Sequence, residues 1–357
     1  MTADARPEPT VARQHRSERL LATLDPFPRV VLVSHLNPDP DALASMLGLK
    51  ALIDHCLPGK SVTLTMDGMI ARAENRAMVD LVPVPLSPVE SVAFDADTAV
   101  IMVDSQPHTG RRASEAAVPK VVIDHHETGG VLTGVAFHDL RPHVGATCTI
   151  VTGYLLERHV PVPPRLATAL LYGIESEVSG YPREASSLDD GALVWLFPRA
   201  DKDLLAQIRN PKLPQSHFAT VQHALANAFL YRDVVVSWCG AVSQPDIIAE
   251  MADFFVRFDQ VNWALAVGLF GNVLKLSVRV SLLGEGSGEV LREVVDGLGT
   301  AGGHDKRAGG AIPLSDTRPE TIDALLHTIR HRLLSRLAID EHQGRRLLEA
   351  SPVIQAP

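Results

Sequence analysis

The chain has 357 residues, 46% of them hydrophobic, and this size and composition predict a globular protein of two domains. Its 42 acidic and 33 basic residues give a formal net charge of −9. Because binders of long nucleic acids usually present a basic face, this charge argues against extended DNA or RNA duplexes as the main partner. It does not exclude a small phosphorylated substrate, since metals and a few local cations can supply a positive field.

Signals for targeting and for an oxidising compartment are missing from the sequence. No run of about 20 apolar residues occurs, so we expect no membrane span and no membrane partner. Residues 1–24 lack the apolar core of a secretory signal. Cys56, Cys148 and Cys239 show neither a metal-binding spacing nor a disulfide framework. We therefore expect buried thiols and a cytoplasmic location.

Three apolar runs in the first half of the chain each end in acids or histidines. Such runs are typical of buried strands in a parallel sheet, where ligands bind beyond the carboxyl ends of the strands. A single strand ending in Asp is common, because Asp starts turns and caps helices; three together predict a site. Residues 29–33 run into Ser34-His35-Leu36-Asn37-Pro38-Asp39-Pro40-Asp41, residues 98–103 into Asp104, and residues 121–123 into Asp124-His125-His126.

Segments with helical spacing separate these runs. Apolar residues recur with this spacing over 42–56, and a strand at 61–66 and a helix at 72–81 follow. A further short strand is expected at 135–137. Later helices are expected at 147–157, at 164–172 and over much of 186–230.

The last third of the chain has a different order of elements. A strand within 231–242, a helix at 247–255, a hairpin over 263–280 and a helix at 289–297 predict a small mixed sheet. Residues 319–350 predict one or two helices, which present either an ordinary solvated face or a weak nucleic-acid contact. The arginines on this segment are Arg330, Arg332, Arg336, Arg345 and Arg346.

Carboxylates together with imidazoles suit Mn²⁺, and to a lesser degree Mg²⁺, Zn²⁺ or iron. Two such ions can activate a water molecule and hold both oxygens of an in-line displacement at phosphorus. The residues themselves predict this kind of site only by their type and clustering.

The motifs resemble those of the DHH phosphoesterase superfamily, and they occur in the family order over residues 28–315. A glycine-rich segment, Gly302-Gly303-His304 with Ala308-Gly309-Gly310, resembles the signature of the associated DHHA1 domain. The family motif His-x-x-x-Asp-x-Asp-Ala matches His35, Asp39, Asp41 and Ala42, the lone Asp matches Asp104, and Asp-His-His matches Asp124, His125 and His126.

One position departs from the family pattern. Where the family has Gly-Ile-x-Thr-Asp-Thr-Gly with a metal-binding Asp, Glu177 stands at the Asp position. Glutamate is also a hard oxygen ligand but is one methylene longer. It could bind directly or through water, or mark a weakened second metal site, with Glu175 as the alternative ligand.

The resemblance implies a site for two metal ions, with Mn²⁺ expected and Mg²⁺ as the alternative. Asp124 would orient a neighbouring ligand, and His126 would face the substrate phosphate or protonate the leaving oxygen. One ion would be bound by His35, Asp39 and Asp104, and the other by Asp41, Asp104, His125 and Glu177, with Asp104 bridging. The residues implied in substrate binding are Gly302, Gly303, His304, Arg307 and Arg111.

The fold implied is α/β, with a doubly wound parallel-sheet DHH domain, a helical connector and a smaller mixed α/β DHHA1 domain. The substrate cleft would lie between the two domains. The expected limits are 1–27 for an extension, 28–185 for the DHH domain, 186–230 for the connector, 231–345 for the DHHA1 domain and 346–357 for a tail.

The size and motif content are most similar to the nanoRNase and pAp phosphatase group. We therefore expect a metal-dependent phosphoesterase or exonuclease acting on short oligonucleotides, linear dinucleotides or 3′-phosphoadenosine 5′-phosphate. Two alternatives stay open: a cyclic-dinucleotide phosphodiesterase, and a nucleotide-binding sensor with weakened catalysis, which Glu177 would favour. The family also suggests a homodimer.

Overall fold

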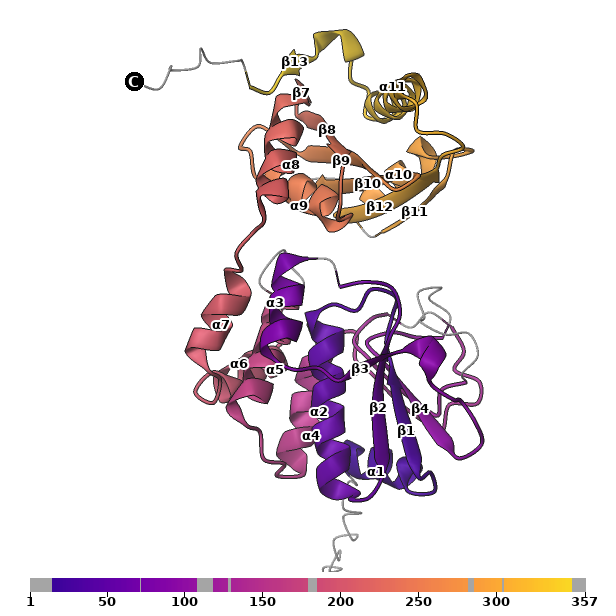
Figure 1. Ribbon diagram of the computed structural model, residues 1–357, viewed down its shortest axis with the longest axis vertical. Helices are drawn as coiled ribbons and strands as arrows, with labels where there is room; N and C mark the ends of the chain where they lie inside the picture. Colours follow the sequence, from indigo (N-terminus) through magenta and orange to yellow (C-terminus); the bar gives the residue numbers. More distant parts are fainter. Residues whose placement is uncertain are drawn as a thin grey trace, which may run out of the picture. The chain divides into compact units, whose positions relative to one another are not determined.

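The computed structural model describes residues 15–70, 72–107, 118–127, 130–178, 185–281, 286–303 and 305–348. The chain forms two compact units, residues 1–211 and 212–357, each with its own sheet and hydrophobic core (Figure 1). Their boundary falls within the segment predicted as a helical connector. Among the described helices, none combines the length and apolar character that a membrane crossing requires.

The first unit contains a six-stranded parallel sheet in the order β3-β2-β1-β4-β5-β6. The order reverses direction between β1 and β4, which confirms the doubly wound fold. In such sheets the carboxyl ends of the two strands at the reversal flank the ligand crevice. The strands are β1 (Arg29–Val33), β2 (Ser61–Met66), β3 (Leu86–Pro88), β4 (Thr98–Val103), β5 (Val121–Asp124) and β6 (Phe137–Leu140).

Helices α2, α4 and α5 form a layer on one side of this sheet (Figure 1). A Cβ added at Gly48 would lie 2.6 Å from Val151 Cγ1, and one at Gly173 would lie 2.6 Å from Cys148 Sγ, so both glycines allow close helix packing. The helices are α1 (Arg16–Leu24), α2 (Pro40–Cys56), α3 (Ala73–Leu81), α4 (Thr147–Glu157), α5 (Pro164–Val178), α6 (Ser187–Leu196) and α7 (Lys202–Arg209), with a 3₁₀ turn η1 (Val89–Ser91).

At the start of α2, the predicted metal ligand Asp39 is also the N-cap of the helix. Its side chain accepts a 3.0 Å hydrogen bond from the N–H of Ala42, and Pro40 occupies the first helical position. Proline suits that position because its missing N–H would be unpaired there in any case. The helix therefore begins two residues before the predicted start.

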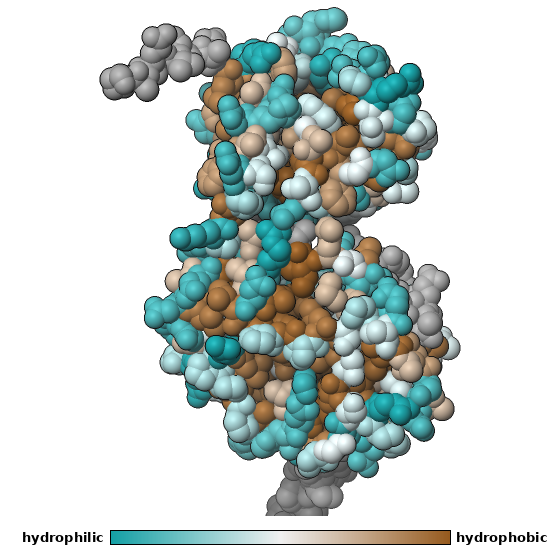
Figure 2. All heavy atoms as spheres, in the orientation of Figure 1, coloured by the Kyte–Doolittle hydropathy of each residue, from teal (hydrophilic) through white to brown (hydrophobic). Residues whose placement is uncertain are grey.

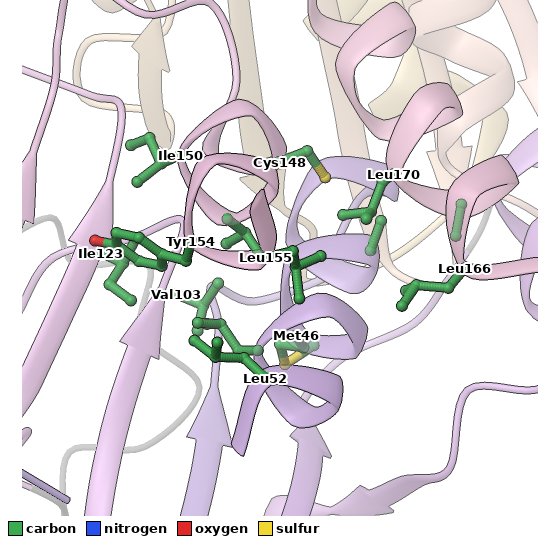
Figure 3. Close-up of a cluster of buried hydrophobic side chains, with 14 of the residues drawn as sticks. Met46, Leu52, Val103, Ile123, Cys148, Ile150, Tyr154, Leu155, Leu166 and Leu170 are labelled. Carbon is green, nitrogen blue, oxygen red and sulfur yellow. The ribbon is translucent and has the colours of Figure 1, made fainter. Parts of the chain in front are cut away.

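Apolar side chains from the sheet and from the helix layer meet in the core of the first unit. Figure 3 shows Leu52 of α2, Val103 of β4 and Ile123 of β5 together with Leu155 of α4, and all four are fully buried. Each such side chain stabilises the fold by about 1.5–3 kcal/mol relative to an exposed position. The polar ends of β1, β4 and β5 are therefore held on a closely packed scaffold.

The second unit contains a seven-stranded mixed sheet in the order β11-β12-β10-β9-β8-β7-β13, in which β8 and β9 pair in parallel and the other neighbours are antiparallel. This confirms the predicted second, different sheet. Its strands are β7 (Ala228–Tyr231), β8 (Val234–Ala241), β9 (Trp263–Phe270), β10 (Val273–Val280), β11 (Thr300–Gly303), β12 (Arg307–Pro313) and β13 (Arg345–Arg346), and its helices are α8 (Gln215–Ala226), α9 (Asp246–Phe255), α10 (Ser287–Val294) and α11 (Pro319–Arg336).

The C-terminal segment is less helical than predicted. Helix α11 ends at Arg336, Ala338 adopts a left-handed φ of 53°, and a 3₁₀ turn η2 (Glu341–Gln343) follows. Arg345 and Arg346 then form β13, which pairs with β7. These two arginines, which the sequence predicts to be helical, therefore lie on an edge strand.

On the face of the molecule in Figure 2, polar side chains are interspersed with apolar ones over both units.

Candidate metal centre

The predicted site residues of the first unit lie at the carboxyl ends of β1, β4 and β5. Asp104 directly follows β4, and its N–H donates a 2.9 Å hydrogen bond to the carbonyl of Ile123. It has a φ of 55°, a left-handed conformation that side-chain-bearing residues adopt rarely and mostly where the surrounding structure enforces it. Its carboxylate is buried.

Two groups of side chains that could hold a metal ion share Asp104. One is His35, Asp39 and Asp104, the other is Asp104, His125 and His126, and the ligand atoms of each lie within 4.8 Å of one another. Asp104 Oδ2 lies 3.5 Å from His35 Nε2, whereas Asp104 Oδ1 lies 3.5 Å from His125 Nε2. The two oxygens of one carboxylate thus face two different imidazoles.

Both imidazoles are oriented through their other nitrogen. His35 Nδ1 lies 3.0 Å from the carbonyl oxygen of Leu36, and His125 Nδ1 lies 3.3 Å from that of Val144. Because a carbonyl oxygen can only accept, each Nδ1 carries the hydrogen and each Nε2 faces the carboxylates. Metal-binding histidines are commonly held in this way.

Asp41 is buried, and the start of α4 fixes its carboxylate. Oδ2 accepts a 2.7 Å hydrogen bond from the N–H of Thr147, and Oδ1 accepts a 2.7 Å hydrogen bond from the N–H of Cys148. The Thr147 hydroxyl donates to Asp104 Oδ1 at 2.8 Å. His125 Nε2 lies 3.9 Å from Asp41 Oδ2. One helix start, with its positive field, therefore orients two of the acids.

Electrostatics in the site reflect closely spaced carboxylates. Burial raises the pKa of Asp41, and the charges of Asp104, Glu177 and Asp39 raise it further. Burial also acts to raise the pKa of Asp104, but the hydrogen bond from His35 and the positive histidines outweigh it and hold that pKa below its usual range. This concentration of negative charge is what a divalent cation would neutralise.

The pKa of His35 is shifted by the carboxylates around it. Burial acts to lower its pKa, but the hydrogen bond to Asp104 and the charges of Asp39 and Asp104 raise it to about 10. The two acids thus favour a positive charge at this position.

Asp124 orients His126, the more accessible histidine of the pair. Asp124 Oδ1 lies 2.8 Å from His126 Nδ1 and accepts a 2.8 Å hydrogen bond from the N–H of His125. Asp124 Oδ2 accepts from Gln106 Nε2 at 2.8 Å. The side chain of His126 is 34% exposed and that of His125 is 1% exposed. Of the two histidines, only His126 is therefore readily accessible to a substrate that enters from solvent.

Glu177 and Glu175 both lie on α5 but have different surroundings. Glu177 is half-buried, and its charge contributes to the raised pKa of Asp41, which places it within electrostatic reach of the site. Glu175 pairs with Arg209 of α7, whose Nε donates to Oε2 at 3.1 Å. This ion pair directs Glu175 towards α7.

The glycine-rich motif lies in the second unit, at the edge strand β11. A Cβ added at Gly303 would lie 2.3 Å from the carbonyl oxygen of Arg307, so the tight approach of β11 to β12 requires this glycine. A Cβ added at Gly302 would meet no atom within 4 Å, and Arg307 is exposed. His304 and Arg111 lie outside the described residues.

Thr147 and Gln106 were not among the predicted site residues. The sequence marks the helix start near Thr147, but it contains no signal for a hydroxyl contact with an acid 43 residues earlier. Gln106 is two residues beyond Asp104, and its Nε2 donates to Asp124 Oδ2 and lies 3.3 and 3.1 Å from the carbonyl oxygens of His126 and Glu127.

Comparisons with known proteins agree with this architecture. Residues 29–174 match the profile described as "DHH family, N-terminal domain". An uncharacterised protein of Methanocaldococcus jannaschii is 31% identical over 324 residues, which cover 88% of this chain and 65% of that protein. The chain thus spans slightly less than two thirds of the length of this relative.

Two solved structures have a similar fold. An exopolyphosphatase-related protein from Bacteroides fragilis gives a TM-score of 0.70 at 15% identity and covers 92% of this chain and 98% of its own. RecJ from Thermus thermophilus, solved in complex with Mn²⁺, gives a TM-score of 0.51 at 17% identity and covers 90% of this chain and 54% of its own. At these identities the similarity concerns the fold.

Proposed function

We propose that the protein is a metal-dependent phosphoesterase of short nucleotides, because residues 29–174 match the DHH-family profile. Its substrates are short oligonucleotides, linear dinucleotides or 3′-phosphoadenosine 5′-phosphate. The observation that carries the proposal is Asp104, whose two oxygens face His35 and His125 in two separate groups of metal-ligand type. A carboxylate shared in this way suits two neighbouring ions.

The donor set fits the proposed ions. Carboxylate oxygens suit both Mg²⁺ and Mn²⁺, and the two imidazoles favour Mn²⁺. RecJ, which has a similar fold, was solved in complex with Mn²⁺, and this agrees with a divalent cation at such a site. In the proposal one ion is held by His35, Asp39 and Asp104, and the other by Asp41, Asp104, His125 and Glu177.

When bound, two such ions supply an activated water and neutralise charge on the phosphoryl oxygens. His126 is proposed to protonate the leaving oxygen or to contact the substrate phosphate. Asp124 fixes the ring through Nδ1, which leaves Nε2 to carry the transferable proton, and the Asp124 carboxylate stabilises the protonated imidazole.

The proposed substrate is small and anionic. The formal net charge of −9 disfavours a long polyanionic partner. In the second unit, Gly302 leaves open space beside the backbone, and Arg307 is an exposed basic residue. We propose that these residues, together with Gly303, His304 and Arg111, hold the substrate.

A reducing cytoplasm and a homodimer complete the proposal. The three cysteines are free, and Cys148 and Cys239 are buried, which supports a reducing compartment. On the first unit Leu188, Val194 and Phe197 are exposed at or next to α6, and they provide apolar surface for a second copy. Light scattering on the protein as it elutes from a size-exclusion column would measure the mass of the assembly.

The test of the proposed activity is hydrolysis by the purified protein with Mn²⁺. Substrates would be pAp, linear pApA and pGpG, cyclic di-AMP, a 5-mer and a 24-mer RNA, and pyrophosphate, with Asp104→Ala as the control. Mn²⁺-dependent turnover of the short linear substrates, lost in Asp104→Ala, would support the proposal. Preference for the 24-mer would indicate a long-chain exonuclease, preference for cyclic di-AMP a cyclic-dinucleotide phosphodiesterase, and nucleotide binding without turnover a sensor.

A further inference from the structure

Asp189 belongs to α6 and has an ordinary role there. Helix α6 begins with a capping box, in which Ser186 Oγ accepts from the N–H of Asp189 and Asp189 Oδ2 accepts from the N–H of Ser186 at 2.7 Å. Capping boxes are common at helix starts because they satisfy two otherwise unpaired donors. A side chain that served only as part of this cap would not need to be fully buried.

The carboxylate of Asp189 is fully buried and also reaches a second helix. Its Oδ2 accepts a 2.8 Å hydrogen bond from the N–H of Gly145, and its Oδ1 accepts a 2.5 Å hydrogen bond from the hydroxyl of Thr149. A Cβ added at Gly145 would lie 3.0 Å from Asp189 Oδ2 and 2.6 Å from Val178 Cγ1, so this close approach needs glycine. Neither Gly145 nor Thr149 contributes to the cap of α6.

Gly145 and Thr149 lie on either side of Thr147, at the start of α4. The N–H of Thr147 donates to Asp41, and its hydroxyl donates to Asp104. Asp189 therefore holds, from both sides, the helix turn that orients two carboxylates of the candidate metal centre. A chain of hydrogen bonds runs from the start of α6, through the start of α4, to the ends of the strands.

We propose that Asp189 is a positioning residue of the metal centre, which fixes the start of α4 so that Thr147 presents its donors to Asp41 and Asp104. This inference rests on the proposed function, since it assumes that the two acids bind metal. Residues that orient metal ligands typically change metal affinity by 10- to 100-fold when they are removed. A residue that only caps α6 would have no such effect.

The test is calorimetric titration of Mn²⁺ into the metal-free, full-length protein, with thermal unfolding measured for each variant. Asp189→Ala removes both contacts to α4, and we expect Mn²⁺ binding to weaken about 10- to 100-fold. Asp189→Asn should restore most of the affinity, because its amide oxygen can accept from Gly145 and its amino group can donate to the Thr149 hydroxyl. Ser186→Ala is the matched control: it weakens the cap of α6 but leaves both contacts to α4, so we expect wild-type affinity with a lower melting temperature.

Equal thermal destabilisation by Asp189→Ala and Ser186→Ala, with Mn²⁺ affinity within about twofold of wild type in both, would overturn the inference. If Asp189→Ala fails to fold, Thr149→Val decides, because it removes one contact to α4 and keeps the cap; unchanged affinity in that variant would also overturn it. A wild-type protein that binds no Mn²⁺ would instead overturn the proposed metal centre, and the inference with it.

Discussion

Asp41 accepts a 2.7 Å hydrogen bond from the main-chain N–H of Thr147, a residue 106 positions further along the chain. The hydroxyl of the same threonine donates to Asp104 at 2.8 Å. Two acids that follow different strands are thus oriented by one residue at the start of α4. Mutation can separate the two contacts, because the main-chain donor remains when the side chain changes.

The variant Thr147→Val should separate the contact with Asp41 from the contact with Asp104. The valine keeps the shape of the side chain and the N–H that faces Asp41, but removes the donor to Asp104. We expect Mn²⁺ affinity to fall about 10- to 100-fold, whereas Thr147→Ser, which keeps the hydroxyl, should stay close to wild type. Calorimetric titration measures both variants. Wild-type affinity in Thr147→Val would mean that Asp104 does not depend on this contact.

Asp104→Asn should affect both proposed ions at once. The amide cannot neutralise two cations, so we expect fewer than two bound Mn²⁺ per chain and a loss of turnover beyond the roughly 100-fold typical of residues that only orient ligands. Metal analysis after dialysis and steady-state kinetics measure these effects. Asp95→Asn is the control, since Asp95 lies on the surface and pairs with Arg29. Two bound ions in Asp104→Asn would contradict a bridging role.

Glu177→Gln and Glu175→Gln compare two acids on the same helix. We expect Glu177→Gln to weaken one of the two Mn²⁺ sites about 10-fold, because a neutral amide is a poorer ligand, and Glu177→Asp to retain binding. Glu175→Gln should leave Mn²⁺ affinity unchanged and cost at most about 1 kcal/mol of stability through its partly exposed ion pair with Arg209. The opposite pattern would assign the ligand to Glu175.

The strands and the main acids of the site could be predicted from the sequence because they follow a local pattern. Apolar runs that end in Asp or His give β1, β4 and β5 directly, and the strand at Ser61–Met66 has the predicted limits. The rule that ligands bind beyond the carboxyl ends of parallel strands then brings Asp104 and His125 together.

The residues that orient these acids could not be predicted in the same way. Thr147 contacts an acid 43 residues earlier, and Asp189 contacts Gly145 44 residues earlier, and neither contact leaves a periodic trace in the chain. The end of α11 shows the same limit. Arg345 and Arg346 continue a helical pattern, but pairing with β7 decides their conformation.

His126→Ala tests whether His126 donates a proton or binds metal, since its Nδ1 lies 2.8 Å from Asp124 but also 3.8 Å from Asp104. As a general acid it should contribute about 10²- to 10⁴-fold to turnover. We expect kcat to fall by this amount, the decline of activity at high pH to disappear, and Mn²⁺ affinity to stay near wild type. His125→Ala, the comparison variant, should lose Mn²⁺ binding. Equal loss of Mn²⁺ affinity in both variants would make His126 a ligand.

Asp139 of β6 should make the stability of the first unit depend on pH. Its buried carboxylate accepts hydrogen bonds from Arg141 Nη2 at 2.7 Å and from the Tyr154 hydroxyl at 2.6 Å, and it pairs with Arg16 of α1. Burial acts to raise its pKa, but these hydrogen bonds and the two arginines outweigh burial and lower the pKa. Because the folded pKa lies below the unfolded value of about 3.9, ionised Asp139 stabilises the fold above about pH 4, and this contribution is lost as the pH falls through the folded pKa.

Asp139→Asn should therefore lower the free energy of unfolding by about 1–3 kcal/mol at pH 7, because the neutral amide no longer offers a charged acceptor to the half-buried Arg141 and the more exposed Arg16. The difference from wild type should shrink as the pH falls below about 4, because the carboxyl then takes up a proton first in the unfolded chain and, at lower pH, in the folded protein. Urea unfolding at a series of pH values measures it. Asp316→Asn is the control: its pKa is also lowered, mainly by the hydrogen bond from Arg318, but solvent screens this exposed pair, so we expect little change at any pH. A destabilisation by Asp139→Asn that is the same at pH 3 and pH 7 would show that the loss comes from packing and not from the charge of Asp139.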